Sequence, residues 1–140
     1  MATPIETELS DWALLTFWFF RRPFDDSRVP SALLERVVLT CIAQGRDSPT
    51  VIDRYLDLRE PGSRPIRATL IRKGLVEEAT GSDPRRKVLS LTLAGEQLLS
   101  DQRAMMGRAL IGTIHRSGLA SLEDVKGAAA VLTKALLVRE

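Results

Sequence analysis

The spacing of apolar residues changes within one short segment of this chain, and that change constrains the fold more than any other feature. Residues 75–79 and 87–92 have the composition of two strands and flank a turn at residues 81–84, which predicts a β-hairpin. Elsewhere the apolar residues recur mostly at helical spacing. Because an isolated hairpin is only marginally stable in water, this one must pack against helices. The sequence therefore predicts a mainly α-helical fold with a single small β-hairpin.

Cap and turn residues divide the rest of the chain into six helices. The first helix should end before Pro23, because a proline disfavours helical geometry in the residue ahead of it. Ser48 followed by Pro49 marks one helix start, and Ser121 with Asp124 forms a capping box at another. The expected ranges are 6–21, 31–44, 49–57, 63–73, 93–116 and 122 to near the C-terminus.

The length and composition suit one globular domain with a core of its own, since the chain has 140 residues of which 44% are hydrophobic. Cys41 is the only cysteine and His115 the only histidine, so neither a disulfide within the chain nor a metal site is expected. The longest apolar stretch, residues 12–20, is too short to span a bilayer and follows acidic residues, unlike a signal peptide. We expect a cytoplasmic protein that does not bind membranes.

Known catalytic signatures are absent from the sequence. It contains no Gly-x-Gly-x-x-Gly or Walker loop, no His-Glu-x-x-His zinc motif and no Gly-x-Ser-x-Gly nucleophile motif. His115 and Cys41 are far apart in the sequence, and no pair of carboxylates stands out from the surface charge. We therefore expect a protein that is not an enzyme and that needs no cofactor.

The two short helices before the hairpin have the layout of a helix-turn-helix, in which the second helix enters the major groove of DNA. With Ile66 at the centre of the buried side of this second helix, the helical period turns the opposite side outward. The outward residues are Arg64, Ala68 and Arg72, with Arg67 on the flank. An arginine fork matches the O6 and N7 edge of guanine, and a small alanine can touch a thymine methyl group.

Positive charge is concentrated in the same region. Residues 59–87 contain eight Lys or Arg and four Asp or Glu, whereas the rest of the chain has a small negative excess. Arg85, Arg86 and Lys87 lie at the predicted hairpin tip, which could reach into a narrow minor groove. Asp83 is placed to form an ion pair with Arg85. The alternatives are a solvated helix face and a turn whose charges protect an edge strand from aggregation.

Three motifs follow one another between residues 70 and 99. They are Leu70-x-x-x-Gly74-Leu75-Val76, Asp83-x-Arg85 and Leu89-Ser90-Leu91-Thr92-x-x-Gly95. Together they resemble the recognition-helix end, the wing and the long-helix entry of the multiple-antibiotic-resistance regulator (MarR) family. The order of the elements extends this resemblance across most of the chain.

The resemblance implies a winged helix-turn-helix fold and a homodimeric transcriptional regulator that binds double-stranded DNA at an inverted repeat. Within a single domain, residues 31–92 would form the DNA-binding region, and residues 6–22 and 93–138 would form the dimerisation helices. The expected DNA contacts are Ser63, Arg64, Arg67, Ala68, Arg72, Arg85 and Arg86, with Asp83 and Arg85 as an ion pair in the wing.

The start of the recognition helix departs from the family pattern. That helix usually begins with Ser and Thr, whereas Glu60, Pro61 and Pro65 stand at the start of this one. Because proline is tolerated only in the first helical turn, the helix should begin near Ser63 and be short. Glu60 would also repel a phosphate. These departures slightly favour the alternative function, a winged-helix protein–protein interaction module that does not bind DNA.

The aromatic residues near the N-terminus suggest a second site. The resemblance implies a pocket for a small aromatic or lipophilic effector, and Trp12, Phe19 and Cys41 are its candidate lining residues. The alternative is that these aromatic side chains form only the core and the dimer interface. Cys41 lies within an apolar run, so we expect its thiol to be buried and unreactive.

Overall fold

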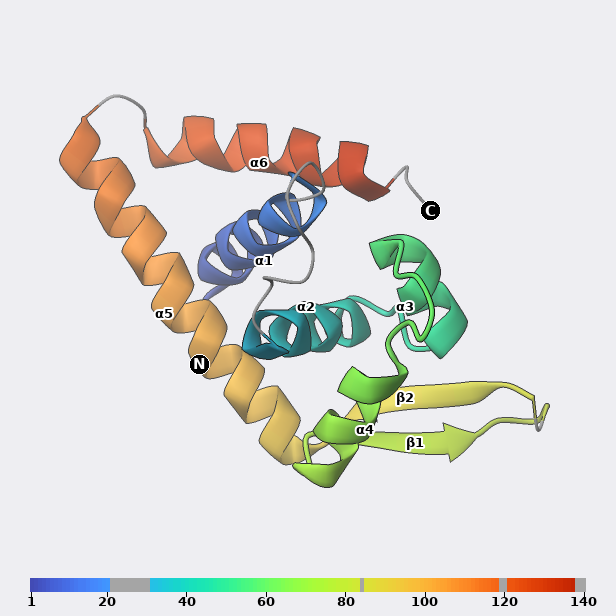
Figure 1. The fold of residues 1–140 in the computed structure, drawn as a ribbon. Helices are drawn as coiled ribbons and strands as arrows, with labels where there is room; N and C mark the ends of the chain where they lie inside the picture. Colours follow the sequence, from blue (N-terminus) through green and yellow to red (C-terminus); the bar gives the residue numbers. More distant parts are fainter. Residues whose placement is uncertain (21–30, 84, 119–120, 138–140) are drawn as a thin grey trace. The chain divides into compact units, whose positions relative to one another are not determined.

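The computed structural model describes residues 1–20, 31–83, 85–118 and 121–137 (Figure 1). Over these residues the chain forms six helices and one two-stranded antiparallel sheet. The elements are α1 (Pro4–Phe20), α2 (Ser31–Ala43), α3 (Pro49–Leu56), α4 (Arg64–Arg72), β1 (Val76–Thr80), β2 (Lys87–Leu91), α5 (Leu93–Ser117) and α6 (Leu122–Leu137). The predicted fold class and element order are confirmed.

Two of the predicted helix starts are formed by the cap residues that the sequence indicated. At α3 the Ser48 hydroxyl accepts a hydrogen bond from the backbone N–H of Val51, at 3.2 Å. At α6 the side chains of Ser121 and Asp124 each accept a bond from the other residue's backbone N–H, at 3.1 and 3.4 Å. The capping box predicted at α6 is therefore confirmed.

The chain divides into two compact units, and the boundaries between them fall within α1 and α5. The terminal unit comprises residues 1–17 and 100–140, and the winged unit comprises residues 18–99. The assignment of dimerisation to the terminal helices and of DNA binding to the middle of the chain stays a prediction. Some positions named in it lie outside the described residues, namely 21, 22, 119, 120 and 138 in the dimerisation ranges and Pro84 in the wing turn.

In the terminal unit, α1 begins at a capping box formed by Thr3 and Glu6. Each side chain accepts a hydrogen bond from the other residue's backbone N–H, at 3.2 and 2.7 Å. The bond from the Thr3 N–H is the main cause that holds the pKa of Glu6 below its usual range, and the ion pair with Arg108 at 3.1 Å acts in the same direction. Because of this cap, α1 starts at Pro4, two residues earlier than predicted.

Two contacts join α1 to the part of α5 that belongs to the terminal unit. The guanidinium group of Arg103 donates to both carboxylate oxygens of Asp11, at 2.9 and 2.7 Å, and both side chains are mostly buried. A Cβ on Gly107 would lie 2.5 Å from the Cα of Glu6. The close approach of the two helices therefore requires glycine at this position.

The core of the winged unit lies where α2, α3, α4 and the sheet meet. α2 packs against α3, α4 and β2, and α4 packs against β1 (Figure 1). The most buried apolar side chains, each at most 1% exposed, are Val37, Val38, Leu39, Cys41, Ile52, Tyr55, Leu56, Leu70 and Leu89. The expected burial of Cys41 is therefore confirmed.

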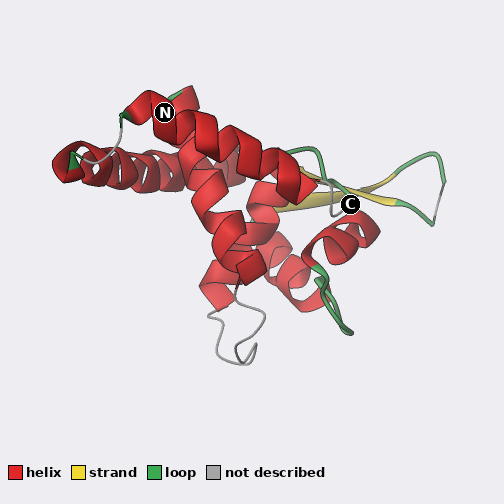
Figure 2. Cartoon of the chain, turned by 90° about the horizontal axis from the view of Figure 1, so that it is seen from above, coloured by secondary structure: helices red, strands yellow, loops and turns green. Residues whose placement is uncertain are grey.

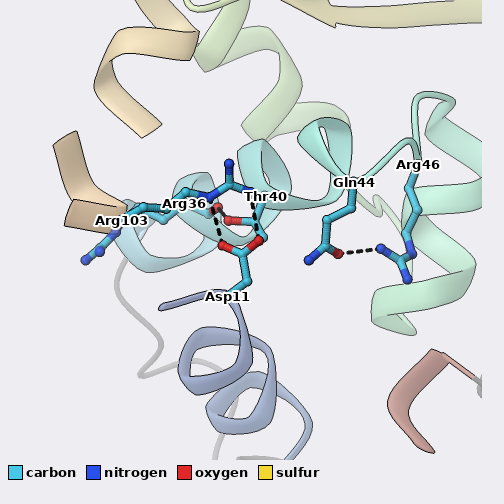
Figure 3. A network of polar contacts seen from close by, with 6 residues as sticks. All are labelled: Asp11, Arg36, Thr40, Gln44, Arg46 and Arg103. Carbon is cyan, nitrogen blue, oxygen red and sulfur yellow. Dashed lines mark hydrogen bonds and ion pairs between the residues drawn. The ribbon is translucent and has the colours of Figure 1, made fainter. Parts of the chain in front are cut away.

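Aromatic residues connect the end of α1 to α3 within the winged unit. The ring N–H of Trp18 donates to the last carbonyl of α3, at 3.2 Å. The Phe19 ring meets the Tyr55 ring edge-on at 5.3 Å, and the guanidinium group of Arg46 lies 3.6 Å from the centre of the same tyrosine ring. Arg46 also donates to the side-chain carbonyl of Gln44 at 2.6 Å (Figure 3). Tyr55 is thus held on two sides.

The hairpin is anchored at its base and exposed toward its tip. β1 and β2 pair antiparallel, with Val76 opposite Leu91 at the base and Thr80 opposite Lys87 near the tip. Val76 and Leu89 are the strand residues that are fully buried among those described. Figure 2 shows a loop segment beside each strand at the tip of the hairpin. This arrangement is the predicted wing.

Thr92 joins the base of the hairpin to the end of α4 and the start of α5. Its hydroxyl donates to the Gly74 carbonyl at 2.6 Å and accepts from the Gly95 N–H at 3.1 Å. Its own N–H donates to the carbonyl of Leu75 at 3.0 Å. A Cβ on Gly95 would lie 2.1 Å from that same Leu75 oxygen, closer than any real contact. The Leu-Thr-x-x-Gly motif is therefore a packing requirement of this junction.

Candidate nucleic-acid interface

α4 is fixed at its start and along one side. The backbone N–H of Ser63, the residue before the helix, donates to a carboxylate oxygen of Asp53 in α3 at 2.9 Å. Pro65 lies in the first turn, where its missing N–H breaks no helical hydrogen bond. Leu70 is fully buried in the core of the winged unit. The side of α4 opposite these anchors is therefore available to solvent.

A groove of about 800 Å³ runs along this outer side of α4, between the start of α3 and the hairpin. The residues that α4 contributes are Arg64, Arg67, Ala68 and Ile71. Their spacing of i, i+3, i+4 and i+7 places them on one side of the helix. The other lining residues are Asp47, Ser48, Pro49, Thr50, Val51 and Arg54 from α3 and the turn before it, and Glu78, Arg85, Arg86, Lys87 and Val88 from the hairpin.

Positive charge dominates the lining of the groove, with six Lys or Arg against two acidic side chains. The cations that are exposed and form no ion pair within the described part of the chain are Arg54, Arg64, Arg85 and Arg86. The acidic residues are Asp47 and Glu78, whereas Glu60 is exposed in the turn before α4 and lies outside the groove. A concave surface of this charge attracts phosphate groups.

Three large apolar side chains are also exposed in the groove. Val51, Ile71 and Val88 are 39%, 40% and 40% exposed, and each comes from a different bordering element. With Ala68 they give the basic groove an apolar lining. Base edges in the major groove include the thymine methyl group, which binds apolar side chains. We did not predict Val51, Ile71, Val88 or Arg54 as site residues.

The prediction that Ser63 contacts DNA is wrong. Its side chain is fully buried, and its hydroxyl accepts a hydrogen bond from Nε of Arg67 at 3.0 Å. Ser63 lies seven residues before Leu70, which is nearly two full helical turns, so the two residues share the buried side. The side chain of Arg67 is 13% exposed and also contacts Glu78, at 3.5 Å. Ser63 therefore orients Arg67 instead of facing solvent.

The rotation of α4 about its axis also differs from the prediction. We placed Ile66 at the centre of the buried side, but the fully buried residue is Leu70, and Ile66 is only partly buried. As a result Ile71 lies in the groove, and Arg72 is exposed outside it. The predicted DNA contacts that do line the groove are Arg64, Arg67, Ala68, Arg85 and Arg86.

At the tip of the hairpin, Asp83 shapes the turn and does not pair with a guanidinium group. Its carboxylate accepts a hydrogen bond from the backbone N–H of Arg85 at 2.9 Å, and its carbonyl accepts one from the N–H of Arg86. A carboxylate that bonds the N–H two residues on forms an Asx turn. Within the described residues no ion pair joins Asp83 to Arg85, so that prediction is corrected. Both arginine side chains are exposed.

The three residues proposed for an effector pocket belong to different units. Trp12 lies in the terminal unit, and its ring N–H is buried without a hydrogen-bond partner among the described residues. Phe19 and the fully buried Cys41 lie in the winged unit. None of them lines the groove beside α4. The effector pocket stays a prediction.

No group of three His, Cys, Asp or Glu side chains in the described part of the chain is arranged to hold a metal ion. None of the described helices combines the length and the apolar character needed to cross a bilayer.

The sequence matches no family model and no curated relative, but solved structures resemble the fold. A MepR variant from a multidrug-resistant S. aureus clinical isolate has a TM-score of 0.63 and 19% identity, over 94% of this chain and 87% of that one. Wild-type apo MarR from E. coli has a TM-score of 0.59 and 17% identity, over 93% and 90%. The S. aureus MepR–DNA complex has a TM-score of 0.53 and 20% identity, over 96% and 89%. The chain therefore has the winged helix-turn-helix fold of MarR and MepR, as its motifs predicted.

Proposed function

We propose that this protein is a transcriptional regulator that binds double-stranded DNA sequence-specifically, as a homodimer on an inverted repeat. The observation that carries the proposal is the basic groove between α4 and the hairpin, which leaves four cations exposed and without an ion pair within the described residues. The fold is shared with MepR, which has been solved in complex with DNA. The sequence contains no Gly-x-Gly-x-x-Gly, Walker, His-Glu-x-x-His or Gly-x-Ser-x-Gly motif that would favour an enzyme instead.

In the proposed complex, α4 enters the major groove and the hairpin tip follows the adjacent backbone or minor groove. Arg64 is the candidate for reading guanine, because its guanidinium group is exposed at the start of the helix. Ala68 and Ile71 lie on the same side of α4 and are candidates for contact with thymine methyl groups. Arg85 and Arg86 supply charge to phosphates from the wing.

A salt titration of binding to duplex DNA of mixed sequence tests the proposal. Each phosphate that a cation neutralises lowers the logarithm of the association constant by about 0.9 per tenfold rise in salt. With four exposed cations per chain, we expect a slope of up to about −3.6 for each bound chain, and so up to about −7 for the homodimer, measured by fluorescence anisotropy. A protein–protein interaction module would instead show no DNA affinity even at low salt, and that result would contradict the proposal.

The homodimer is the second part of the proposal. Met105 and Val131 in the terminal unit are 66% and 68% exposed, which leaves apolar surface for a second copy to cover. Sedimentation equilibrium at micromolar concentration should give twice the chain mass of 15.5 kDa. Selection of bound duplexes from a random-sequence library should in addition yield an inverted repeat. A monomer in sedimentation, or a selected site without symmetry, would contradict the dimer.

A further inference from the structure

One acidic side chain in the groove forms ion pairs with two of the groove's cations. One carboxylate oxygen of Glu78 lies 3.5 Å from a terminal nitrogen of Arg67, and the other lies 3.2 Å from Nζ of Lys87. The Glu78 side chain is 25% exposed and belongs to the groove lining. A single anionic group thus joins a cation on α4 to a cation on β2. A DNA phosphate carries the same charge and also presents two oxygens, so it can replace the carboxylate here.

The strand geometry explains why Glu78 faces the groove and its neighbour does not. Side chains alternate between the two faces of a strand, so Glu77 points to the opposite face of β1 from Glu78. Glu77 is exposed and is not part of the groove lining. Arg67 is held from its other side by the Ser63 hydroxyl, which keeps its guanidinium group within reach of Glu78. The contact therefore follows from the register of the wing against α4.

The strength of these ion pairs decides what Glu78 can do. Ion pairs that keep some contact with water are weak, so a phosphate can displace them. Until it is displaced, the carboxylate withholds Arg67 and Lys87 from phosphate and repels the phosphate itself. Binding to DNA of arbitrary sequence depends almost entirely on phosphate contacts. The Glu78 carboxylate should therefore weaken binding to DNA of arbitrary sequence more than binding that also depends on base contacts.

We propose that Glu78 competes with DNA phosphate for Arg67 and Lys87 and thereby limits the affinity of this protein for DNA of arbitrary sequence. The inference rests on the proposed DNA-binding function and adds to it a residue that restrains binding. It assigns Glu78 to the control of specificity and not to the contact with bases, because Glu78 lies on the wing and not on α4.

Glu78→Gln removes the charge at nearly constant shape, and Glu77→Gln is the matched control with the same change in net charge. Binding of a labelled mixed-sequence duplex is followed by anisotropy between about 50 and 200 mM salt. We expect Glu78→Gln to bind more tightly and its salt slope to be steeper by about 1 to 2 for each bound chain, because up to two more phosphates per chain are neutralised. Glu77→Gln should keep the slope of the natural sequence.

Lys87→Gln gives a second, independent test through a double-mutant cycle. It should weaken DNA binding less in the natural sequence, where Glu78 holds Lys87, than in the Glu78→Gln background. The inference is overturned if Lys87→Gln weakens DNA binding equally in both backgrounds. It is also overturned if Glu78→Gln and Glu77→Gln change the affinity and the salt slope equally. Either result leaves the proposed DNA binding itself intact. If the natural sequence binds no DNA at any salt concentration, the proposed function fails and the inference fails with it.

Discussion

Replacing Gly95 by alanine should destabilise the winged unit by about 1–3 kcal/mol or more, because the new methyl group overlaps the backbone. Its Cβ would lie 2.1 Å from the Leu75 oxygen and 3.0 Å from the Leu75 carbonyl carbon. Neither atom belongs to a flexible side chain, so the helix start or the strand must move. The same movement would break the Thr92 bonds to Gly74 and Gly95 that close the junction.

Urea unfolding followed by circular dichroism measures this effect, and Gly81→Ala is the control in the same unit. A Cβ on Gly81 would meet Val88 at 3.8 Å, which is ordinary contact, so this variant should match the natural sequence or be more stable by about 0.4–1 kcal/mol. Equal stability of the Gly95 and Gly81 variants would show that the close approach to Leu75 does not constrain the fold.

The example of Gly95 shows how far the sequence could predict this structure. The Leu-Thr-x-x-Gly motif located the long-helix start correctly, but the reason for the glycine was not visible in it. The obstacle to any larger residue is the carbonyl of Leu75, twenty residues earlier, and only the tertiary structure brings the two together. Local signals such as the Ser48 cap and the Ser121 capping box were sufficient because their partners lie three residues away.

The N-terminal cap was a signal of the same local kind that we overlooked. Thr3, Pro4 and Glu6 have the spacing of a capping box with proline at the first helical position. The pattern of apolar residues begins later, so the prediction started the helix at residue 6. Attention to the polar residues ahead of that pattern would have given the observed start.

The rotation of α4 is different, because no local signal determines it. Ile66, Leu70 and Ile71 are all apolar, and each is compatible with the buried side of a short helix. Packing against α2 and β1 buries Leu70 and leaves Ile71 40% exposed in the groove. That choice also buries Ser63 and moves Arg72 out of the groove. The sequence therefore indicated the region in which the groove lies, while the individual residues that line it depended on tertiary packing.

The contrast between Arg64 and Arg85 gives the sharpest test of whether the groove beside α4 binds DNA as proposed. Both side chains are exposed and line the groove, but Arg64 begins α4 and Arg85 lies at the hairpin tip. If Arg64 meets a guanine edge, Arg64→Ala should weaken binding to the selected site by about 1–3 kcal/mol for each half-site, or roughly 5- to 150-fold per half-site. It should also relax the base preference at one position of each half-site.

Arg85→Ala should behave differently, because a wing arginine contacts mainly the backbone. We expect it to weaken binding to the selected site and to mixed-sequence DNA by the same factor, and to lower the salt slope by about 1 for each bound chain, or about 2 for the homodimer. Arg116→Ala is the control, since Arg116 is an exposed arginine at the end of α5 in the terminal unit. Anisotropy titrations on both duplexes, with site selection repeated for each variant, measure these effects. If the Arg64 and Arg85 variants bind both duplexes as the Arg116 variant does, the groove beside α4 is not the DNA-binding surface.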